Sequence, residues 1–185
     1  MRIAVSGAHG VGKTTFCNDL ADALKNKGFS VEIKTDVARS LREEGVPINR
    51  GTEESQYPLF LERHLANLLD NGDSDFVVYD RTMLDTIAYA TANGNLGDQW
   101  LSFLRKAATP LLHSIDTYFY IPIEFEIEND GVRATEREYQ TEVDKALTEI
   151  LKECRPNFIT LTGGRDERVA EALRSIPTSI GSMIA

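Results

Sequence analysis

Short apolar segments alternate along the chain with longer segments in which apolar residues recur every three or four positions. The short segments indicate five β-strands, over residues 3–6, 29–34, 75–80, 117–121 and 157–161. The longer ones predict helices over residues 13–27, 36–44, 52–70, 83–92, 99–112, 136–153 and 166–173. Because strands that alternate with helices form a parallel sheet, we expect an α/β three-layer sandwich with a five-stranded parallel sheet.

The size and composition of the chain fit one domain. It has 185 residues, of which 42% are hydrophobic, and this is enough for one sizeable core. The periodic pattern ends before residue 177, so we expect a single domain over residues 1–176 and a C-terminal tail over 177–185. Ligands of parallel α/β sheets bind at the carboxyl ends of the strands. Residues directly after each strand are therefore candidates for a functional site.

The first predicted strand runs into a glycine-rich turn. Residues 7–14 read Gly-Ala-His-Gly-Val-Gly-Lys-Thr and match the P-loop pattern G-x-x-x-x-G-K-[ST] in full, between a strand and a helix. Glycines let backbone N–H groups approach phosphate oxygens, and the helix N-terminus adds its dipole. The sequence therefore predicts a P-loop fold that binds ATP through Gly7, Gly10, Val11, Gly12, Lys13, Thr14 and Thr15.

Three side chains of this loop have distinct predicted roles. Lys13 is expected to reach the β- and γ-phosphates and to act in catalysis. The Thr14 hydroxyl is expected to ligate Mg²⁺, and the Thr15 hydroxyl to donate to the α-phosphate. A chance glycine turn would not explain both the complete motif and its position between a predicted strand and a predicted helix.

An acidic residue closes the apolar run over residues 76–79. Asp80 is predicted to help hold Mg²⁺ and to act in catalysis, because P-loop sites place a carboxylate at a neighbouring strand end. A helix N-cap is a second reading of Asp80, compatible with the first. Arg81 follows and is predicted to bind phosphates of a substrate, with a salt bridge to Asp85 as the alternative.

The second strand ends just before another charged pair. Asp36 is predicted to accept or position the proton of an acceptor hydroxyl, and Arg39 to hold a charged group of that acceptor. A helix cap for Asp36 and a solvated Arg39 explain the pattern equally well.

A third arginine-bearing segment follows the fourth strand. Residues 130–133, Asp-Gly-Val-Arg, fall in a stretch without periodicity, and Arg137 comes one helical turn later. We expect a lid near residues 123–140 that closes over ATP, with Arg133 acting in catalysis and Arg137 binding the nucleotide. A polar surface loop is the alternative interpretation.

Net charge, the length of apolar runs and cysteine content indicate which partners and which cellular compartment to expect. The formal net charge is −9, which disfavours binding to duplex DNA, because such proteins need a basic face. No apolar run approaches the roughly 20 residues that span a bilayer, so no membrane partner is expected. Two cysteines are too few for a disulfide framework and fit a reducing compartment, so we expect a cytoplasmic protein.

Taken together, these motifs resemble the P-loop nucleoside and nucleotide kinases. The chain is most similar to the nicotinamide-riboside-kinase-like domains found attached to regulators of NAD synthesis and in phage proteins. The matching parts are the P-loop, the Asp36–Arg39 region, the strand ending at Asp80, and residues 130–133 before an acidic helix. The resemblance implies a five-stranded parallel sheet, use of ATP and Mg²⁺, and a closing lid. Asp80-Arg81 also looks like the Asp-Arg pair of thymidylate-type and deoxynucleoside kinases, which leaves the acceptor open.

The function expected from the sequence is transfer of the γ-phosphoryl group of ATP to a small nucleoside, nucleotide or nucleoside-like acceptor. Two alternatives stay open. One is a kinase that acts on a modified base or an end of DNA, and the other is a P-loop regulatory ATPase whose output is a contact with a partner.

Overall fold

The computed structural model describes residues 1–70, 72–124, 133–155 and 157–176, and of residues 133–136 it describes the backbone only. The β-strands are β1 Arg2–Ser6, β2 Val31–Lys34, β3 Phe76–Asp80, β4 Thr117–Tyr120 and β5 Ile159–Thr160. The α-helices are α1 Lys13–Lys25, α2 Val37–Glu43, α3 Tyr57–Leu69, α4 Met83–Asn93, α5 Asp98–Leu112, α6 Arg133–Cys154 and α7 Arg165–Ser175. Short 3₁₀ turns cover Asn49–Gly51 and Glu54–Gln56.

The five strands form one parallel sheet in the order β2-β3-β1-β4-β5. The predicted fold class is confirmed. The central strand β1 pairs with β3, where Val5 lies opposite Asp80, and with β4, where Ser6 lies opposite Tyr120. This register brings the ends of β1, β3 and β4 together at one edge of the sheet, and the loop after β1 starts there.

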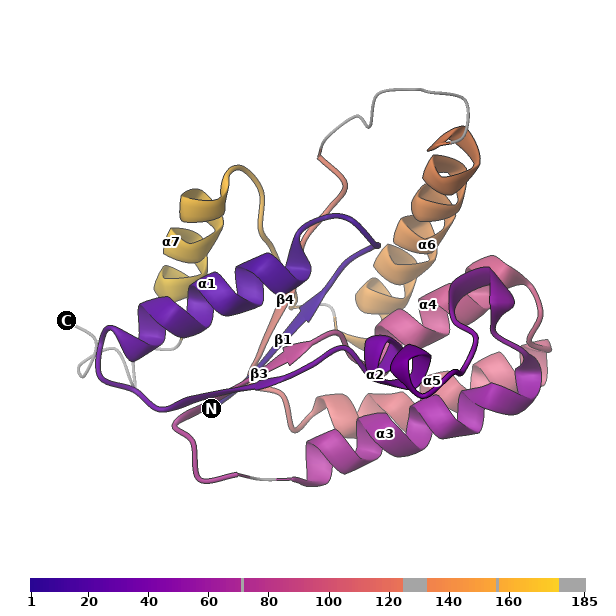
Figure 1. Cartoon of the computed structure of the whole chain (residues 1–185), viewed down its shortest axis with the longest axis horizontal. Helices are drawn as coiled ribbons and strands as arrows, with labels where there is room; N and C mark the ends of the chain where they lie inside the picture. The colour runs from indigo at the N-terminus through magenta and orange to yellow at the C-terminus, as the bar shows by residue number, and fades with distance from the viewer. Residues whose placement is uncertain (71, 125–132, 156, 177–185) are drawn as a thin grey trace.

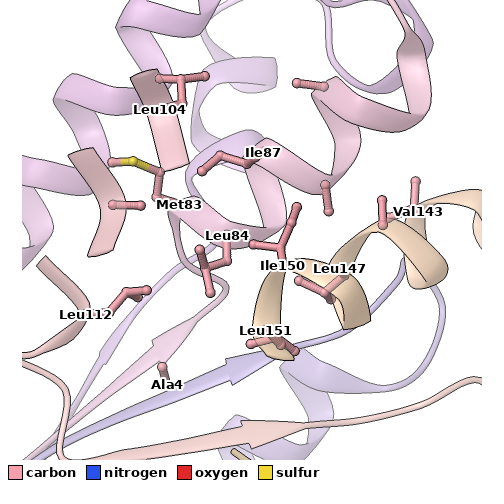
Figure 2. Close-up of a cluster of buried hydrophobic side chains, with 14 of the residues drawn as sticks. Ala4, Met83, Leu84, Ile87, Leu104, Leu112, Val143, Leu147, Ile150 and Leu151 are labelled. Carbon is pink, nitrogen blue, oxygen red and sulfur yellow. The ribbon is translucent and has the colours of Figure 1, made fainter. Parts of the chain in front are cut away.

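Helices cover both faces of the sheet, with α1 and α7 on one side and α3, α4, α5 and α6 on the other (Figure 1). Successive strand residues point to opposite faces. Ile3 and Val5 therefore join a core under α1 and α7, whereas Ala4 joins the larger core on the other side. Figure 2 shows this larger core, where α4 residues such as Leu84 and Ile87 face α6 residues and the sheet.

Several predicted boundaries were wrong, each for a local reason. The helix predicted over 52–70 begins at Tyr57, because Pro58 suits the first turn and a 3₁₀ turn precedes it. Helix α6 begins at Arg133, not at residue 136. Strand β5 spans two residues because it pairs only with Phe119 and Tyr120 at the edge of the sheet. Among the described residues, no helix is both long and apolar enough to cross a membrane.

Candidate active site

The P-loop leaves the end of β1 and passes directly beside the end of β4. A Cβ atom on Gly7 would lie 2.5 Å from the carbonyl oxygen of Ile121, so no larger residue fits there without a backbone shift. Gly12 has φ of 90° and stands at the N-cap of α1, a left-handed conformation that glycine adopts without strain. These two glycines explain why the strand can turn sharply into a helix whose N-terminus faces the loop.

Lys13 lies at the centre of the loop and is buried, with 4% of its surface exposed. Its ammonium donates a hydrogen bond to the carbonyl oxygen of Ala8. Burial, followed by the nearby Arg81 charge, lowers the pKa of Lys13 to about 7. A phosphate bound in the loop would favour the protonated, charged form of this poorly solvated amine.

Thr14 and Asp80 meet at the junction between α1 and β3. The Thr14 hydroxyl donates to Asp80 Oδ2 at 2.6 Å, and Asp80 Oδ1 is buried with no hydrogen-bond partner among the described residues. A hydroxyl oxygen and an unpaired carboxylate oxygen are hard ligands of the kind that Mg²⁺ prefers. The pair fits a Mg²⁺ ion that is also bound by nucleotide phosphates. Among the described residues, no group of three Asp, Glu, His or Cys side chains is placed to hold a metal ion without such phosphates.

Arg81 occupies an unusual backbone position directly after β3. Its φ is 76°, a left-handed conformation that costs a non-glycine residue about 1–3 kcal/mol. The side chain is held by Asp36 Oδ2, which accepts from its Nε at 2.8 Å, and by Asp85 Oδ1 at 3.6 Å. Thus the predicted salt bridge with Asp85 is present, but Asp36 from the neighbouring strand end is the closer partner.

Asp36 has two partners in this arrangement. Its Oδ1 accepts from the backbone N–H of Ala38 and so caps α2, while its Oδ2 binds Arg81. The predicted cap is therefore present together with the placement at the end of β2. Arg39 is exposed and does not line the cavity described below.

Sequence reasoning gave Asp85 no more than a salt-bridge role, although it touches the P-loop. It is buried in the first turn of α4, and its carboxylate accepts from the Ser6 hydroxyl at 2.5 Å, from Thr82 N–H at 2.9 Å and from Gly7 N–H at 3.3 Å. The signal was visible as Thr82-x-x-Asp85, a capping-box pattern. Burial raises the pKa of Asp85.

A cavity of about 110 Å³ opens between the P-loop, the ends of β2 and β3, and the segment that leads into α3. It is lined by two strand-end residues, Asp36 and Arg81, together with Asp85, aromatic side chains and small polar groups. The complete described lining is His9, Asp36, Ala38, Ile48, Asn49, Thr52, Tyr57, Phe60, His64, Arg81, Asp85, Thr86 and Tyr89. The cavity lies on the opposite side of β1 from β4 and β5, next to the loop that the motif assigns to phosphate.

Two further contacts tie the loop to the C-terminal half of the chain. Gln140 of α6 donates through its side-chain amide to the carbonyl oxygen of His9. Arg168 of α7 donates to the carbonyl oxygen of Val11 at 3.0 Å and forms a salt bridge with Glu124. Neither contact was expected, because both depend on residues more than 100 positions from the loop.

Four further predicted site residues lie in two places, two in or next to the P-loop and two at the start of α6. Thr15 is exposed on the first turn of α1, and Val11 is half-buried. Arg133 is the first residue of α6, but its side chain and residues 125–132 lie outside the described structure, so the predicted lid stays a prediction. Arg137 lies one turn further along α6 and is half-buried.

A known family accounts for most of the chain. The profile of the AAA_28 family, described as AAA domain, matches residues 2–168, which hold the P-loop and both charged strand ends. The chain belongs to this family. The match of the AAA_28 domain ends at Arg168, the α7 residue whose guanidinium reaches the P-loop.

Among curated proteins, this AAA_28 domain is similar to a probable thymidylate kinase of Archaeoglobus fulgidus, with 35% identity over 101 residues. That alignment covers 51% of this chain and 52% of the relative, so the chain matches about half the length of that protein.

Two solved structures share the fold. The NadR protein in complex with NR superimposes with a TM-score of 0.69 at 18% identity, covering 94% of this chain and 50% of NadR. Thymidylate kinase from Ehrlichia chaffeensis superimposes with a TM-score of 0.65 at 18% identity, covering 96% of this chain and 98% of the enzyme. The expected resemblance to P-loop nucleoside and nucleotide kinases is confirmed at the level of the fold.

Proposed function

We propose that this domain transfers the γ-phosphoryl group of ATP to a hydroxyl group of a small nucleoside, nucleotide or nucleoside-like acceptor. The observation that carries the proposal is the position of the cavity. It lies directly beside a complete P-loop, and Asp36 and Arg81 enter it from two adjacent strand ends. The relatives with this fold include thymidylate kinases, which supports a kinase reaction here.

The phosphate side of the reaction is assigned to the P-loop. Backbone N–H groups of residues 7–15 and the N-terminus of α1 would bind the phosphates, and Lys13 would balance the charge on the transferring group. Thr14 and Asp80 would hold Mg²⁺, and the ion would offset negative charge on the phosphates. These residue roles belong to the proposal.

The acceptor side is assigned to the cavity. The acceptor oxygen forms a bond to the γ-phosphorus, while the bond between that phosphorus and the β–γ bridging oxygen breaks and ADP leaves with the electron pair. The hydroxyl proton passes to Asp36, whose carboxylate is held in place by Arg81 and Ala38. Arg133 and Arg137 would complete the site from a lid near residues 123–140, which excludes water from the reacting groups.

An acceptor screen tests the proposal. Purified protein with ATP and Mg²⁺ is incubated with a panel of nucleosides, nucleotides and hydroxymethylated DNA, ADP formation is followed, and the phosphorylated product is identified by mass spectrometry. We expect ADP formation that depends on one small acceptor and is lost in Lys13→Met. Slow ATP hydrolysis that no acceptor stimulates would instead support the regulatory ATPase, and a labelled DNA product would support the polymer kinase.

A further inference from the structure

We propose that the acceptor is a nucleoside without a phosphate group, rather than a nucleoside monophosphate. This inference rests on the proposed function, because it concerns the acceptor cavity of the same site. A phosphate monoester carries a charge of about −1.5 to −2 at neutral pH. Proteins bind such groups with unengaged Arg or Lys side chains and with free N–H groups at helix N-termini.

The charged side chains of the cavity disfavour the binding of a phosphate group. Among the described lining residues, two carboxylates, Asp36 and Asp85, face a single arginine, Arg81, so the formal charge of these three is −1. Arg81 is already neutralised, since its guanidinium binds Asp36 at 2.8 Å and Asp85 at 3.6 Å. A phosphate placed here would have to displace one of these carboxylates and would then lie beside it.

The helix N-termini near the cavity are also satisfied by the protein itself. Asp36 accepts from Ala38 N–H at the start of α2. At the start of α4, the Thr82 hydroxyl accepts from Leu84 N–H, and Asp85 accepts from Thr82 N–H. Because these N–H groups have oxygen partners on the chain, they offer no ready site for a second anion.

Three further basic groups near this face, His64, Arg50 and Arg39, add no positive charge to the described lining. His64 is buried beside the Thr86 hydroxyl at 3.0 Å, and burial lowers its pKa to about 4, so it is neutral at pH 7. Arg50 lies outside the described lining, with its guanidinium carbon 4.5 Å from the centre of the Tyr139 ring. Arg39 is exposed and also lies outside the lining.

The rest of the lining suits an uncharged molecule that carries hydroxyl groups and an aromatic base. Asn49, Thr52 and Thr86 provide neutral hydrogen-bonding groups, and Tyr57 and Tyr89 provide ring surface.

Matched pairs of nucleoside and 5′-monophosphate test this inference. Isothermal titration calorimetry, with a non-hydrolysable ATP analogue and Mg²⁺ present, compares each nucleoside with its own monophosphate. We expect at least one nucleoside to bind about 100-fold or more tightly than its monophosphate. Equal or tighter binding of the monophosphates, or no binding by any nucleoside, would overturn the inference.

A substitution at Asp36 tests whether the carboxylates of the cavity repel a phosphate group. Asp36→Asn removes the negative charge of one of the two carboxylates beside Arg81. Because that carboxylate would repel a phosphate group, we expect the affinity for the monophosphate relative to the nucleoside to rise about tenfold in this variant. Glu43→Gln is the matched control, because it changes the net charge equally from an exposed position on α2 outside the lining. An unchanged preference in Asp36→Asn would contradict the argument.

The binding readout separates this inference from the proposed function. A protein that binds nucleosides selectively but forms no phosphorylated product would fail as a kinase while the acceptor class stands. A protein that phosphorylates only monophosphates would confirm the kinase and overturn the acceptor class.

Discussion

Individual residues at the strand ends each make more than one contact, so substituting one of them changes several interactions at once. Asp36 caps a helix and binds Arg81, while Asp85 holds Ser6, Gly7 and Thr82. Substituting either residue would alter both local geometry and charge. The sharpest single-residue predictions therefore concern Lys13, Asp80 and His64, whose contacts are fewer.

Lys13→Met is expected to lower turnover by about 10²–10³-fold or more, because the transferring phosphoryl group loses its nearest cation. Stability should be retained, since the substitution removes a buried ammonium and keeps an apolar stem. Steady-state kinetics and thermal unfolding check both parts. Lys25→Met, the same substitution at the end of α1, is the control. A folded Lys13→Met protein with turnover near wild type would remove the P-loop from the mechanism.

Asp80→Asn is expected to raise the Mg²⁺ concentration needed for half-maximal activity far more than it changes binding of the adenine part of ATP. The reason is that Asp80 pairs with Thr14 and has a carboxylate oxygen without a hydrogen-bond partner in the described part of the chain, so its charge is available to the metal. Titration of activity with Mg²⁺ measures the effect, with the exposed Asp73→Asn as control. If the Mg²⁺ requirement stayed the same, Asp80 would have only a structural role.

His64 is expected to make the protein less stable in mild acid. Its folded pKa is about 4 and its ordinary value is 6.5, so the unfolded chain takes up the proton first and stability falls as pH drops from 6.5 towards 4. Desolvation dominates this shift, with Asp36 and Arg81 as the charged neighbours. Between pH 7.5 and 5 the loss attributable to His64 should be about 2 kcal/mol.

Urea unfolding of His64→Gln at the two pH values measures that loss. Glutamine keeps a hydrogen-bonding group for Thr86 and has no charge to gain, so the variant should lose about 2 kcal/mol less than wild type over the interval. His113→Gln, at an exposed position, is the control and should follow wild type. Parallel pH profiles for wild type and His64→Gln would show that burial does not perturb this histidine.

At the scale of elements, the sequence predicted the strands and the loop well. Strands β1 and β3 are buried on both faces, so their residues form continuous apolar runs that are easy to recognise. The P-loop motif has fixed spacing, which placed Lys13 and Thr14 on the first turn of α1. Element type could thus be predicted wherever a buried face or a motif imposed it.

What the sequence did not predict depends on distant parts of the chain. The contacts of Gln140 with His9 and of Arg168 with Val11 exist because α6 packs against α4 and α7 packs against α1, and no local pattern predicts this packing. Helix α3 starts at Tyr57 after a 3₁₀ turn over Glu54–Gln56, and the sequence pattern did not distinguish that turn from the α-helix. The positive φ of Arg81 accompanies an ion pair with Asp36, which lies 45 positions earlier in the sequence.

The segment before α6 carries a prediction at this scale. Arg133→Ala is expected to lower kcat more than it raises KM for ATP, because a lid arginine that closes on the transferring group acts mainly in the transition state. In wild type, hydrogen exchange over residues 123–140 should slow when both substrates are bound. Arg174→Ala, at an exposed position on α7, is the control. A defect confined to KM would indicate uniform binding, and normal kinetics would show that the lid is elsewhere.

At the scale of the whole molecule, we predict that residues 1–176 unfold as one domain. Ile176 is 3% exposed and belongs to the core under α1 and α7, so a chain cut after it keeps that core. Removing residues 177–185 should leave a single cooperative transition near the full-length midpoint, as calorimetry would show. Ile176→Ala in the full chain should cost about 2–4 kcal/mol. A second transition, or a large loss of stability after truncation, would contradict the single-domain boundary.

The central place of β1 has a consequence for synthesis of the chain. Residues 2–6 are synthesised well before their neighbours in the sheet, which are residues 77–80 and 117–120. At typical elongation rates, this apolar strand waits on the order of ten seconds for its second neighbour. ATP cannot stabilise the nascent chain during that time, because Asp80 and the β4 edge beside Gly7 are not yet in place. The apolar side chains of this strand therefore stay uncovered by the sheet until residues 117–120 have been synthesised, and such exposed surface favours aggregation.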